Sequence, residues 1–594
     1  MSVLSIPPAE RGPESAVPPA AKPSARNRRV KWRTSLLAHG EPMVWLTGGA
    51  LVICLCMIVG LMLLILRQGL GTFWPVPAVE VHTAQGNRYL GEVIRVDEYQ
   101  PEPGALSGLP PEAKAKAEAE LEEKKGWSTR RLIRTDNFDI TQTHHHWVSD
   151  FEITEESQPE WALIIERATN DGRFNGLPKA FLVDGKEVAT DPAEIWGQYN
   201  QFHDEVRERV RQREKLKKDD IGTVSRKEEE ARLALRAAEM EHGQDSPQYA
   251  AAAQKLQEVN EWAAKEHTRL NGEIAYLDHQ NDRYQIRLAT VDGVEKMLLL
   301  ADIVRAYPAN RLTFGDKLRI FASRWWEFLS DDPRNMNSEG GVFPAIWGTA
   351  AMTLLMSILV VPFGVLAALY LREYAKAGPV VSAVRIAINN LAGVPSIVFG
   401  VFGLGFFCYI WGGSIDSLFF KAHLPSPTFG TGGLLWASLT LALLTVPVVI
   451  VATEEALSAV PRSVREGSYG CGASKWQTIR RIVLPRAMPG ILTGTILAMA
   501  RGAGEVAPLM LVGAVKLAPN LPVDTVFPYI HAQRSFMHLG FHIYDVGFQS
   551  QDSESAKPMV YTTTLVLILL IAMLNLAAMW MRARLRKRFM ASQF

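Results

Sequence analysis

The chain has 594 residues, 48% of them hydrophobic, and a formal net charge of only +1. These values fit either several soluble domains or a membrane protein with a large polar part. Because Asp, Glu, Lys and Arg crowd between residues 80 and 334, the average conceals two unlike regions and excludes any inference about partners from the charge of the whole chain.

Residues 1–42 form a Pro- and Ala-rich segment that we expect to be cytoplasmic and largely disordered. The apolar run at 43–66 follows it and exceeds the roughly 7–15 apolar residues of a cleavable signal peptide, with no small-x-small cleavage site behind it. We therefore predict a first transmembrane helix. Basic residues collect on the cytoplasmic side of a span, which places the N-terminus inside. A cluster of them lies just before this run: Arg26, Arg28, Arg29, Lys31 and Arg33.

Six apolar runs reach the ~20 residues that a helix needs to cross a hydrocarbon core of ~30 Å. They lie at 43–66, 343–371, 380–411, 434–453, 491–515 and 559–581. Threading them from an internal N-terminus places Arg372, Lys376, the segment 464–490 and the basic tail on the cytoplasmic side, where basic residues are expected. We predict an α-helical polytopic membrane protein with six spans and both termini in the cytoplasm.

Residues 67–342 lie between the first two runs and are enough for an external domain with its own core. Alternating segments at 90–96, 181–188 and 284–300 predict strands, and Asp-Gly pairs in the last two suit tight hairpin turns. None of the four cysteines falls in this region, so we expect an α+β domain that folds without disulfides.

The middle of this region predicts a helical hairpin at about 193–277. Residues 193–240 and 247–277 are rich in Glu, Lys, Arg, Ala and Gln without internal prolines, and apolar residues in the second stretch follow coiled-coil spacing. Ser246 and Pro247 suit the start of the second helix. Two interpretations stay open: an arm that reaches a partner, and a solvated spacer or lid packed on its own domain, which we favour.

Three consecutive histidines, His144, His145 and His146, raise the possibility of a metal site. Neighbouring residues on a strand point to opposite faces, so one ion cannot easily take all three. The external region also shows no nucleophile and base pattern. No Gly-x-x-x-x-Gly-Lys-Ser/Thr loop occurs, so the chain cannot be its own conventional ATPase. We expect no metal, no cofactor and no catalytic residue in this chain.

The run at 491–515 places Arg501 and Glu505 four residues apart on one helical face. Ionisable groups at membrane depth are costly unless they are paired or hydrated, so they face a protein interior or a water-filled path. A structural ion pair and a positive charge offered to an anion in transit both remain open. Glycines and prolines beside this pair, and beside Ser396, suit an irregular backbone that lines a cavity.

The charged segment at 464–490 lies between two apolar runs. Trp476, Ile479 and Val483 repeat at helical spacing, while Gly470 and Gly472 interrupt the pattern. We predict two short helices that meet at a glycine turn on the membrane surface and dock a cytoplasmic partner. A lipid-anchored surface helix would explain the basic residues but neither the glycines nor a glutamate in the first helix.

This segment resembles the EAA signature of permeases from ATP-binding-cassette (ABC) importers, with Gly467 and Ser468 in place of the two usual alanines. The resemblance implies a coupling helix that seats in a cleft of the ATPase subunit. The coupling residues that it implies are Glu466, Gly472, Ile482, Leu484 and Pro485.

Three further stretches look like the phosphate-uptake permeases of the PstA type: LYLREYA at 369–375, INNLAGVPSIVFGVFGL at 388–404 and ARGAGEVAPL at 500–509. Val506 stands where that family has a threonine. The resemblance covers 343–594 only. It implies a permease domain with five spans in the bacterial inner membrane, a PstC-like second permease, two copies of a cytoplasmic ATPase that binds ATP, and an external phosphate-binding protein, with no nucleic acid.

Other interpretations remain. The chain could be the PstC-like half, or a permease for sulfate or molybdate, because motif spacing does not select the anion. It could also be an envelope scaffold that uses its hairpin and has lost transport. Such a loss should have eroded the coupling segment and Arg501, and both are present.

Overall fold

The computed structural model describes residues 41–591 except 103, 105, 169–171, 335, 336, 338, 519, 525, 528, 551 and 552. The segment predicted to be disordered, 1–42, lies almost wholly outside this range. The chain divides into two compact units, 1–63 and 64–594. In the first unit, the described residues belong to helix α1 (Glu41–Gly71), which continues into the second.

Six helices in the described part of the chain are long and apolar enough to cross a membrane, which confirms the predicted number of spans. Their bounds are Met43–Gly71, Phe343–Tyr374, Ser396–Phe419, Leu434–Ser458, Lys475–Gly504 and Ala556–Arg584. Four agree with the predicted runs to within a few residues. The third and fifth differ: a proline lies where the third begins late and where the fifth ends early, and the fifth also begins at Lys475 rather than 491.

The third span begins 16 residues later than the predicted start at 380. Helix α9 (Pro379–Leu391) ends first, and a new run starts at Ser396, formed by α10 (Ser396–Phe402), η7 (Gly403–Gly412) and α11 (Gly413–Phe419). Pro395 lies between them with extended backbone angles. Its ring excludes a helical conformation from the preceding residue, so the apolar run cannot be one helix.

The fifth span ends 11 residues before the predicted end at 515. It is a continuous helical run of α14 (Lys475–Thr478), η9 (Ile479–Val483) and α15 (Leu484–Gly504), and a short helix α16 (Ala507–Val512) follows. Pro508 has no N–H to bond to the carbonyl of Gly504, and its ring would clash with that carbonyl. The helix therefore stops before Glu505.

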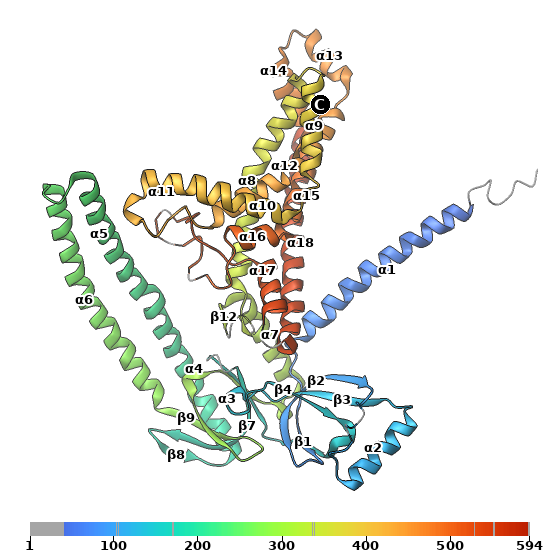
Figure 1. The fold of residues 1–594 in the computed structure, drawn as a ribbon, viewed down its shortest axis with the longest axis vertical. Coiled ribbons are helices and arrows are strands. Elements are labelled where there is room, and N and C mark those ends of the chain that lie inside the picture. The colour runs from blue at the N-terminus through green and yellow to red at the C-terminus, as the bar shows by residue number, and fades with distance from the viewer. Residues whose placement is uncertain are drawn as a thin grey trace, which may run out of the picture. The chain divides into compact units, whose positions relative to one another are not determined.

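Helices α8 (Phe343–Leu369), α12 (Leu434–Ser458), α15 and α18 (Ser553–Ala591) lie side by side in Figure 1. Small residues let α12 and α15 approach closely: a Cβ added to Gly494 would fall 2.4 Å from Ala452, and one on Gly490 would fall 2.5 Å from Ala456. Side chains larger than hydrogen would force these two helices apart.

Residues 78–308 hold two antiparallel sheets. The first has the order β4-β3-β2-β1-β5. Its strands are β1 (Ala78–Thr83), β2 (Arg88–Tyr99), β3 (Ser128–Arg134), β4 (His145–Ser149) and β5 (Ile153–Ser157). Helices α2 (Pro111–Glu123) and α3 (Phe138–Thr141) lie in its connections. The predicted strand at 90–96 falls inside β2.

The second sheet has the order β10-β9-β7-β6-β11, with β8 paired to β7. Its strands are β6 (Leu163–Arg167), β7 (Arg173–Val183), β8 (Lys186–Ala189), β9 (Tyr284–Ala289), β10 (Glu295–Leu299) and β11 (Ile303–Pro308). The predicted turn at Asp184 and Gly185 joins β7 to β8, and both residues have the positive φ that such a turn requires.

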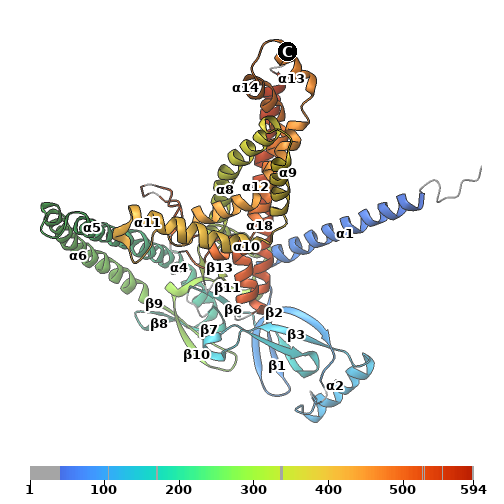
Figure 2. The same ribbon diagram turned by 45° about the horizontal axis from the view of Figure 1, so that its top comes forward.

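Long helices are inserted between β8 and β9: α4 (Pro192–Lys215), η2 (Leu216–Asp220), α5 (Ile221–His242) and α6 (Pro247–Asp282). α5 and α6 run side by side in Figures 1 and 2. The first part of α4 is not a free arm, because Ile195, Tyr199 and Val206 are buried in the core of the second sheet. α5 also contacts η8 (Lys421–His423) of the same chain.

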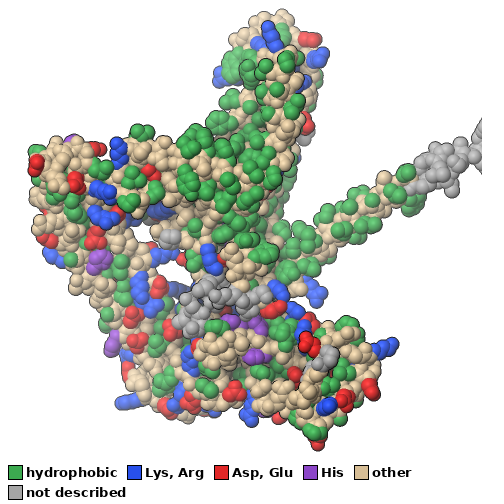
Figure 3. Space-filling view, in the orientation of Figure 1, with side chains coloured by type: hydrophobic (Ala, Val, Ile, Leu, Met, Phe, Trp, Pro, Cys, Tyr) green, Lys and Arg blue, Asp and Glu red, His purple; other side chains and the backbone are tan. Residues whose placement is uncertain are grey.

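Helix α7 (Phe314–Ser330) leads from the second sheet to α8. Its Phe328 packs in one apolar cluster with Phe73, which follows α1. Figure 3 shows hydrophobic side chains gathered over the helices that follow α7, and charged side chains spread over the sheets and the inserted helices. The two unlike compositions of the sequence thus correspond to two structural regions.

Candidate functional site

The predicted coupling segment forms two short helices joined by a tight turn. α13 (Arg462–Gly470) ends at Cys471, and α14 starts at Lys475. Gly472 has a φ of +82°, a conformation that a side chain disfavours. Its N–H donates to the carbonyl of Tyr469 at 2.9 Å, and the N–H of Ala473 donates to that of Ser468 at 3.2 Å. Gly472 is therefore required by the backbone of the turn.

Side-chain hydrogen bonds hold the two helices in one arrangement. Ser474 and Gln477 form a capping box at the start of α14: the Ser474 N–H donates to Gln477 Oε1 at 2.9 Å, and the Gln477 N–H donates to Ser474 Oγ at 3.3 Å. The buried hydroxyls of Ser468 and Thr478 bond at 2.8 Å across the turn. Side-chain hydrogen bonds as well as the backbone therefore fix the conformation of this turn.

The coupling segment is also attached to the end of the second span. Arg465 forms an ion pair with Glu373, whose side chain is buried, and donates to the carbonyl of Leu457 at 2.7 Å. Lys475 Nζ lies 4.8 Å from the ring of Tyr374. Glu373 and Tyr374 belong to the LYLREYA stretch, so two motifs that were singled out separately meet in space.

The predicted coupling residues fall into two groups. Glu466 and Gly472 are exposed on the turn, whereas Ile482, Leu484 and Pro485 are half-buried at its base. Val483, which lies between Ile482 and Leu484 in the sequence, is buried in an apolar cluster with Leu457. Two aromatic side chains stand out from the segment, Tyr469 at 44% exposure and Trp476 at 55%. An exposed apolar and charged turn on a packed base can bind a protein partner.

Arg501 lies in the last turn of α15, and Glu505 follows the helix end with extended backbone angles. The prediction that both lie within one helix is therefore wrong for Glu505. The distance from Arg501 Nε to Glu505 Oε1 is 3.7 Å, which is too long for a hydrogen bond. The side chains are 38% and 21% exposed. The pair is loose, and Arg501 makes no hydrogen bond within the described part of the chain.

Ser396 is the first residue of α10 and is half-buried. It forms no hydrogen bond with Arg501 or Glu505 among the described residues. The two interrupted regions nevertheless meet, because α10 packs against α16: a Cβ added to Gly400 would fall 2.7 Å from the Cα of Pro508. Ser396 thus begins α10, and Glu505 lies two residues before α16, the helix that α10 contacts.

The histidine run lies at the edge strand β4 and before it. The rings of His144 and His146 stack on Phe138 and Tyr89. The described residues contain no group of three His, Cys, Asp or Glu that could hold a metal ion.

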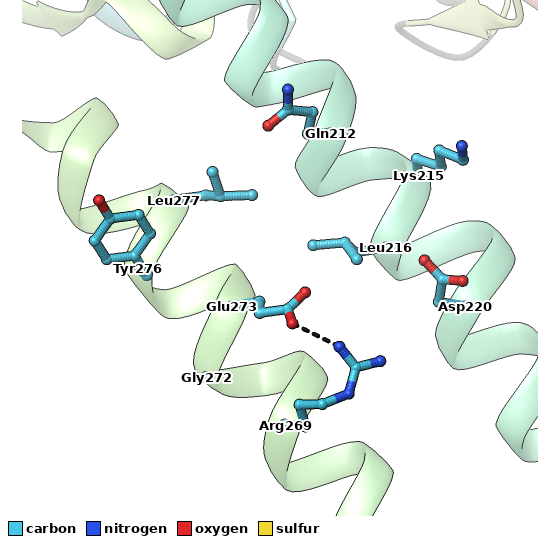
Figure 4. A pocket seen from close by; sticks show the side chains of 9 residues that line it. All are labelled: Gln212, Lys215, Leu216, Asp220, Arg269, Gly272, Glu273, Tyr276 and Leu277. Atoms are coloured by element: carbon cyan, nitrogen blue, oxygen red, sulfur yellow. Dashed lines mark hydrogen bonds and ion pairs between the residues drawn. The ribbon is translucent and has the colours of Figure 1, made fainter.

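The inserted helices form a groove of 650 Å³, which Figure 4 shows from close by. Leu216 from η2 and Leu277 from α6 extend into the space between the helices. Arg269 and Glu273 form an ion pair at 2.5 Å along α6 itself. The charges of Arg269 and Glu273 on α6 neutralise each other. The described residues that line the groove show no feature that selects a ligand.

Sequence reasoning missed two features. Glu373 could have been found as the acid within LYLREYA that balances the arginine-rich coupling segment. The second feature is a cavity lined by arginines and glutamates from distant parts of 67–340, and its residues share no local pattern.

Residues 360–590 match the family described as "Binding-protein-dependent transport system inner membrane component". Curated relatives include the phosphate transport system permease proteins PstA of Mycobacterium leprae, 40% identical over 190 residues, and PstA 1 of Mycobacterium tuberculosis, 34% identical over 264 residues. The aligned parts cover 32% and 44% of this chain and 57% and 76% of those relatives. PstA of Yersinia pestis is 33% identical over 212 residues, covering 34% of this chain and 65% of that protein.

Solved structures that match part of the chain include the MetNI methionine ABC transporter, at 20% identity and a TM-score of 0.31, covering 41% of this chain and 94% of that chain. A bacterial ABC transporter for import of the acidic polysaccharide alginate matches at 16% identity and a TM-score of 0.31, covering 41% and 78%. The family match at 360–590 lies in the part of the chain that holds the last five apolar helices and does not include 67–342.

Proposed function

We propose that this chain is a permease subunit of an ATP-driven phosphate importer. The proposal starts from its family, because the chain belongs to the PstA-type permeases within the binding-protein-dependent transport system inner membrane components. The observation that carries the proposal is a continuous helical run, Lys475–Gly504, with the coupling turn at one end and Arg501 at the other. At 1.5 Å per residue this run spans ~45 Å. One rigid element thus joins a docking surface to a charge suited to an anion.

The coupling turn is proposed to receive the ATPase. Glu466, Gly472 and Trp476 are exposed there, and the turn is fixed by its capping box and by the hydroxyl pair of Ser468 and Thr478. A rigid turn can pass a displacement of the ATPase on to the membrane helix, whereas a flexible turn would change its own conformation instead. Movement of the ATPase would therefore pass through the half-buried residues Ile482, Leu484 and Pro485 into α15.

Arg501 is proposed to meet the anion. Its guanidinium offers a planar fork that fits two phosphate oxygens and keeps its charge in a partly dry site. Glu505 lies close enough to attract Arg501 when the path is empty, but at 3.7 Å it leaves the fork available. Ser396 is proposed to line the same path from the α10 side.

The proposed complex contains a PstC-like second permease, two copies of a cytoplasmic ATPase that binds the ATP, and an external phosphate-binding protein. This chain supplies no catalytic residue. In the proposed orientation both termini are cytoplasmic in a bacterial inner membrane, and 67–342 is an external α+β domain whose helical hairpin, about 193–277, pairs as a coiled coil.

Exposed apolar side chains agree with a surface that lipid or the second permease covers. Val401, Tyr409 and Ile410 on the third span are all more than half exposed. An isolated permease would present this face to lipid, and a pair would bury part of it.

Uptake of labelled anions tests the proposal. Cells that contain the neighbouring subunits should take up phosphate only when this chain is also present, and excess sulfate or molybdate should not compete. Uptake of sulfate or molybdate in place of phosphate would replace the proposed substrate. Equal phosphate uptake without the chain would remove the proposed function.

A further inference from the structure

A cavity of 480 Å³ lies where the sheets meet the end of α1 and the start of α18. Gln68 and Thr72 at the end of α1 line it together with Pro558 and Met559 of α18, and the Thr72 hydroxyl donates to the carbonyl of Pro558 at 3.2 Å. Six arginines line it, contributed by α1, β3, β7, β11, α7 and the segment before α8: Arg67, Arg134, Arg173, Arg305, Arg324 and Arg334. So many arginines in one enclosed space is unusual, because each is costly to bury without a partner.

Two of the arginines that line the cavity, Arg305 and Arg324, form ion pairs with the buried carboxylate of Glu166. Glu166 accepts from Arg324 Nε at 2.9 Å and from Arg305 Nη1 at 2.5 Å, and its side chain is only 8% exposed. Burial alone would raise the pKa of Glu166, but the nearby guanidiniums hold that pKa well below its usual range. Arg324 is fully bonded, since it also donates to Tyr307 and to the carbonyl of Phe73. Arg305 and Arg324 therefore already use their donors within the protein.

The other arginines keep donors to spare. Arg173 bonds Glu92 at 3.2 Å, but its buried Nε has no hydrogen-bond partner, and Glu339 lies 3.9 Å from it. The buried Nε of Arg334 is also unpartnered. An unsatisfied buried donor on a charged group is strongly unfavourable. Arg67 is exposed at the rim and has no ionic partner among the described residues.

The acids that line the cavity do not balance the arginines. Four glutamates face six arginines: Glu92, Glu166, Glu327 and Glu339. Asp136, behind Arg134, neutralises that arginine at 3.1 Å. Burial raises the pKa of Glu339, while Arg173 and Arg134, each 3.9 Å away, oppose that shift. Six arginines and four glutamates with unpartnered guanidinium N–H groups give this cavity the chemistry of an anion site.

We propose that this cavity binds a phosphate-type oxyanion, held by Arg67 at the rim and by the spare donors of Arg173 and Arg334. The volume admits a tetrahedral anion with several waters, since a water occupies about 30 Å³. Guanidinium forks and phosphate oxygens match in geometry as well as charge. The choice of phosphate rests on the proposed function, while the positive excess rests on the cavity alone.

Two sources could supply this chemistry. In the proposed orientation, the cavity lies at the outer ends of the first and last spans, next to the level of lipid headgroups. A free phosphate delivered to the transporter and the phosphodiester of an anionic lipid therefore present the same group. Measuring the binding of inorganic phosphate and of phosphatidylglycerol separately distinguishes these two sources.

The test uses the purified full chain in a phosphate-free maltoside detergent. Equilibrium dialysis with labelled inorganic phosphate should show saturable binding, which should persist in an Arg501→Gln background because that variant removes only the proposed path. Short-chain phosphatidylglycerol is titrated in parallel. Binding of phosphate alone identifies the free anion as the ligand, and binding of phosphatidylglycerol alone identifies the lipid headgroup.

The variant Arg67→Gln should weaken the binding by roughly tenfold, as expected for a lost charged hydrogen bond. Arg67→Lys should keep part of it. Arg319→Gln is the matched control, since Arg319 is also exposed, lies on α7 and does not line the cavity; it should change nothing. Binding of neither ligand, or equal binding by Arg67→Gln and the unmodified chain, would overturn the proposal. Intact cavity binding in a complex whose unmodified form takes up no phosphate would instead count against the proposed function.

Discussion

The two regions of this molecule hold charge in opposite ways. In the membrane helices, Arg501 and Glu505 are 3.7 Å apart and partly exposed. In the sheets, Glu166 is buried and bonded to Arg305 and Arg324. A loosely held charge can exchange its partner for a ligand, whereas a bonded, buried one is committed to the fold. The comparison predicts loss of function without loss of stability in the first region, and the reverse in the second.

The largest expected effect is that of Arg501→Gln, which should abolish phosphate uptake because it removes the positive charge of the guanidinium from the proposed path. Arg501→Lys should retain at most partial uptake, since an ammonium offers a more hydrated point charge. The amount of assembled complex in the membrane should remain normal. An Arg501→Gln protein that fails to assemble would make the pair a structural clamp and break the comparison.

The coupling turn gives the next largest effect. Gly472→Glu introduces a side chain at a φ of +82°, which costs roughly 1–2 kcal/mol, and places it on the proposed docking surface. We expect ATP hydrolysis to be uncoupled from uptake with the subunit still inserted. Gly470→Ala is the control, because Gly470 lacks a positive φ and has open space around it. Normal ATPase co-purification and full uptake by Gly472→Glu would contradict the assignment.

Glu166→Gln should affect stability first. It leaves buried arginines without their carboxylate and should cost about 3–5 kcal/mol, measured by denaturation of the purified chain. Because the folded pKa of Glu166 is lowered, its contribution is fully present above the unfolded value of 4.5 and is lost as pH falls through the folded pKa. The variant should therefore lose less stability than the unmodified chain as the pH falls below 4.5. An identical pH dependence of the two proteins would count against this assignment.

Trimming the inserted helices should have the smallest effect. Removing 217–272 and closing with a short flexible linker retains the core residues Ile195, Tyr199 and Val206, which a deletion of all of 193–277 would destroy. We expect uptake to remain largely intact. If the concentration of binding protein for half-maximal uptake rises about tenfold, equivalent to ~1.4 kcal/mol, the hairpin is a docking arm after all.

The sequence predicted what local rules decide. Hydropathy gave six spans, and glycine with helical spacing gave the coupling turn, because each depends on residues within one or two helical turns. The misplaced start of the third span and end of the fifth coincide with Pro395 and Pro508, which interrupt runs whose hydropathy is continuous. Proline alone does not locate such breaks, because Pro362, Pro447 and Pro558 lie inside continuous helices.

The arginine cavity could not be predicted in this way. Glu166 meets Arg324 across 158 positions and Arg305 across 139, so the pairing depends on how the sheets and α7 pack. Scattered arginines in a polar region look like a solvated surface from sequence. The contact between Arg465 and Glu373, 92 positions apart, was hidden for the same reason.

The central claim is that this chain carries phosphate under the control of a separate ATPase. The most direct measurement is accumulation of labelled phosphate in liposomes that contain the purified complex, with the binding protein on the external side and ATP on the ATPase side. Phosphate should accumulate only with ATP, and Arg501→Gln should stop accumulation in an assembled complex. Accumulation at the unmodified rate by that variant, or no accumulation by the complete unmodified complex, would contradict the account.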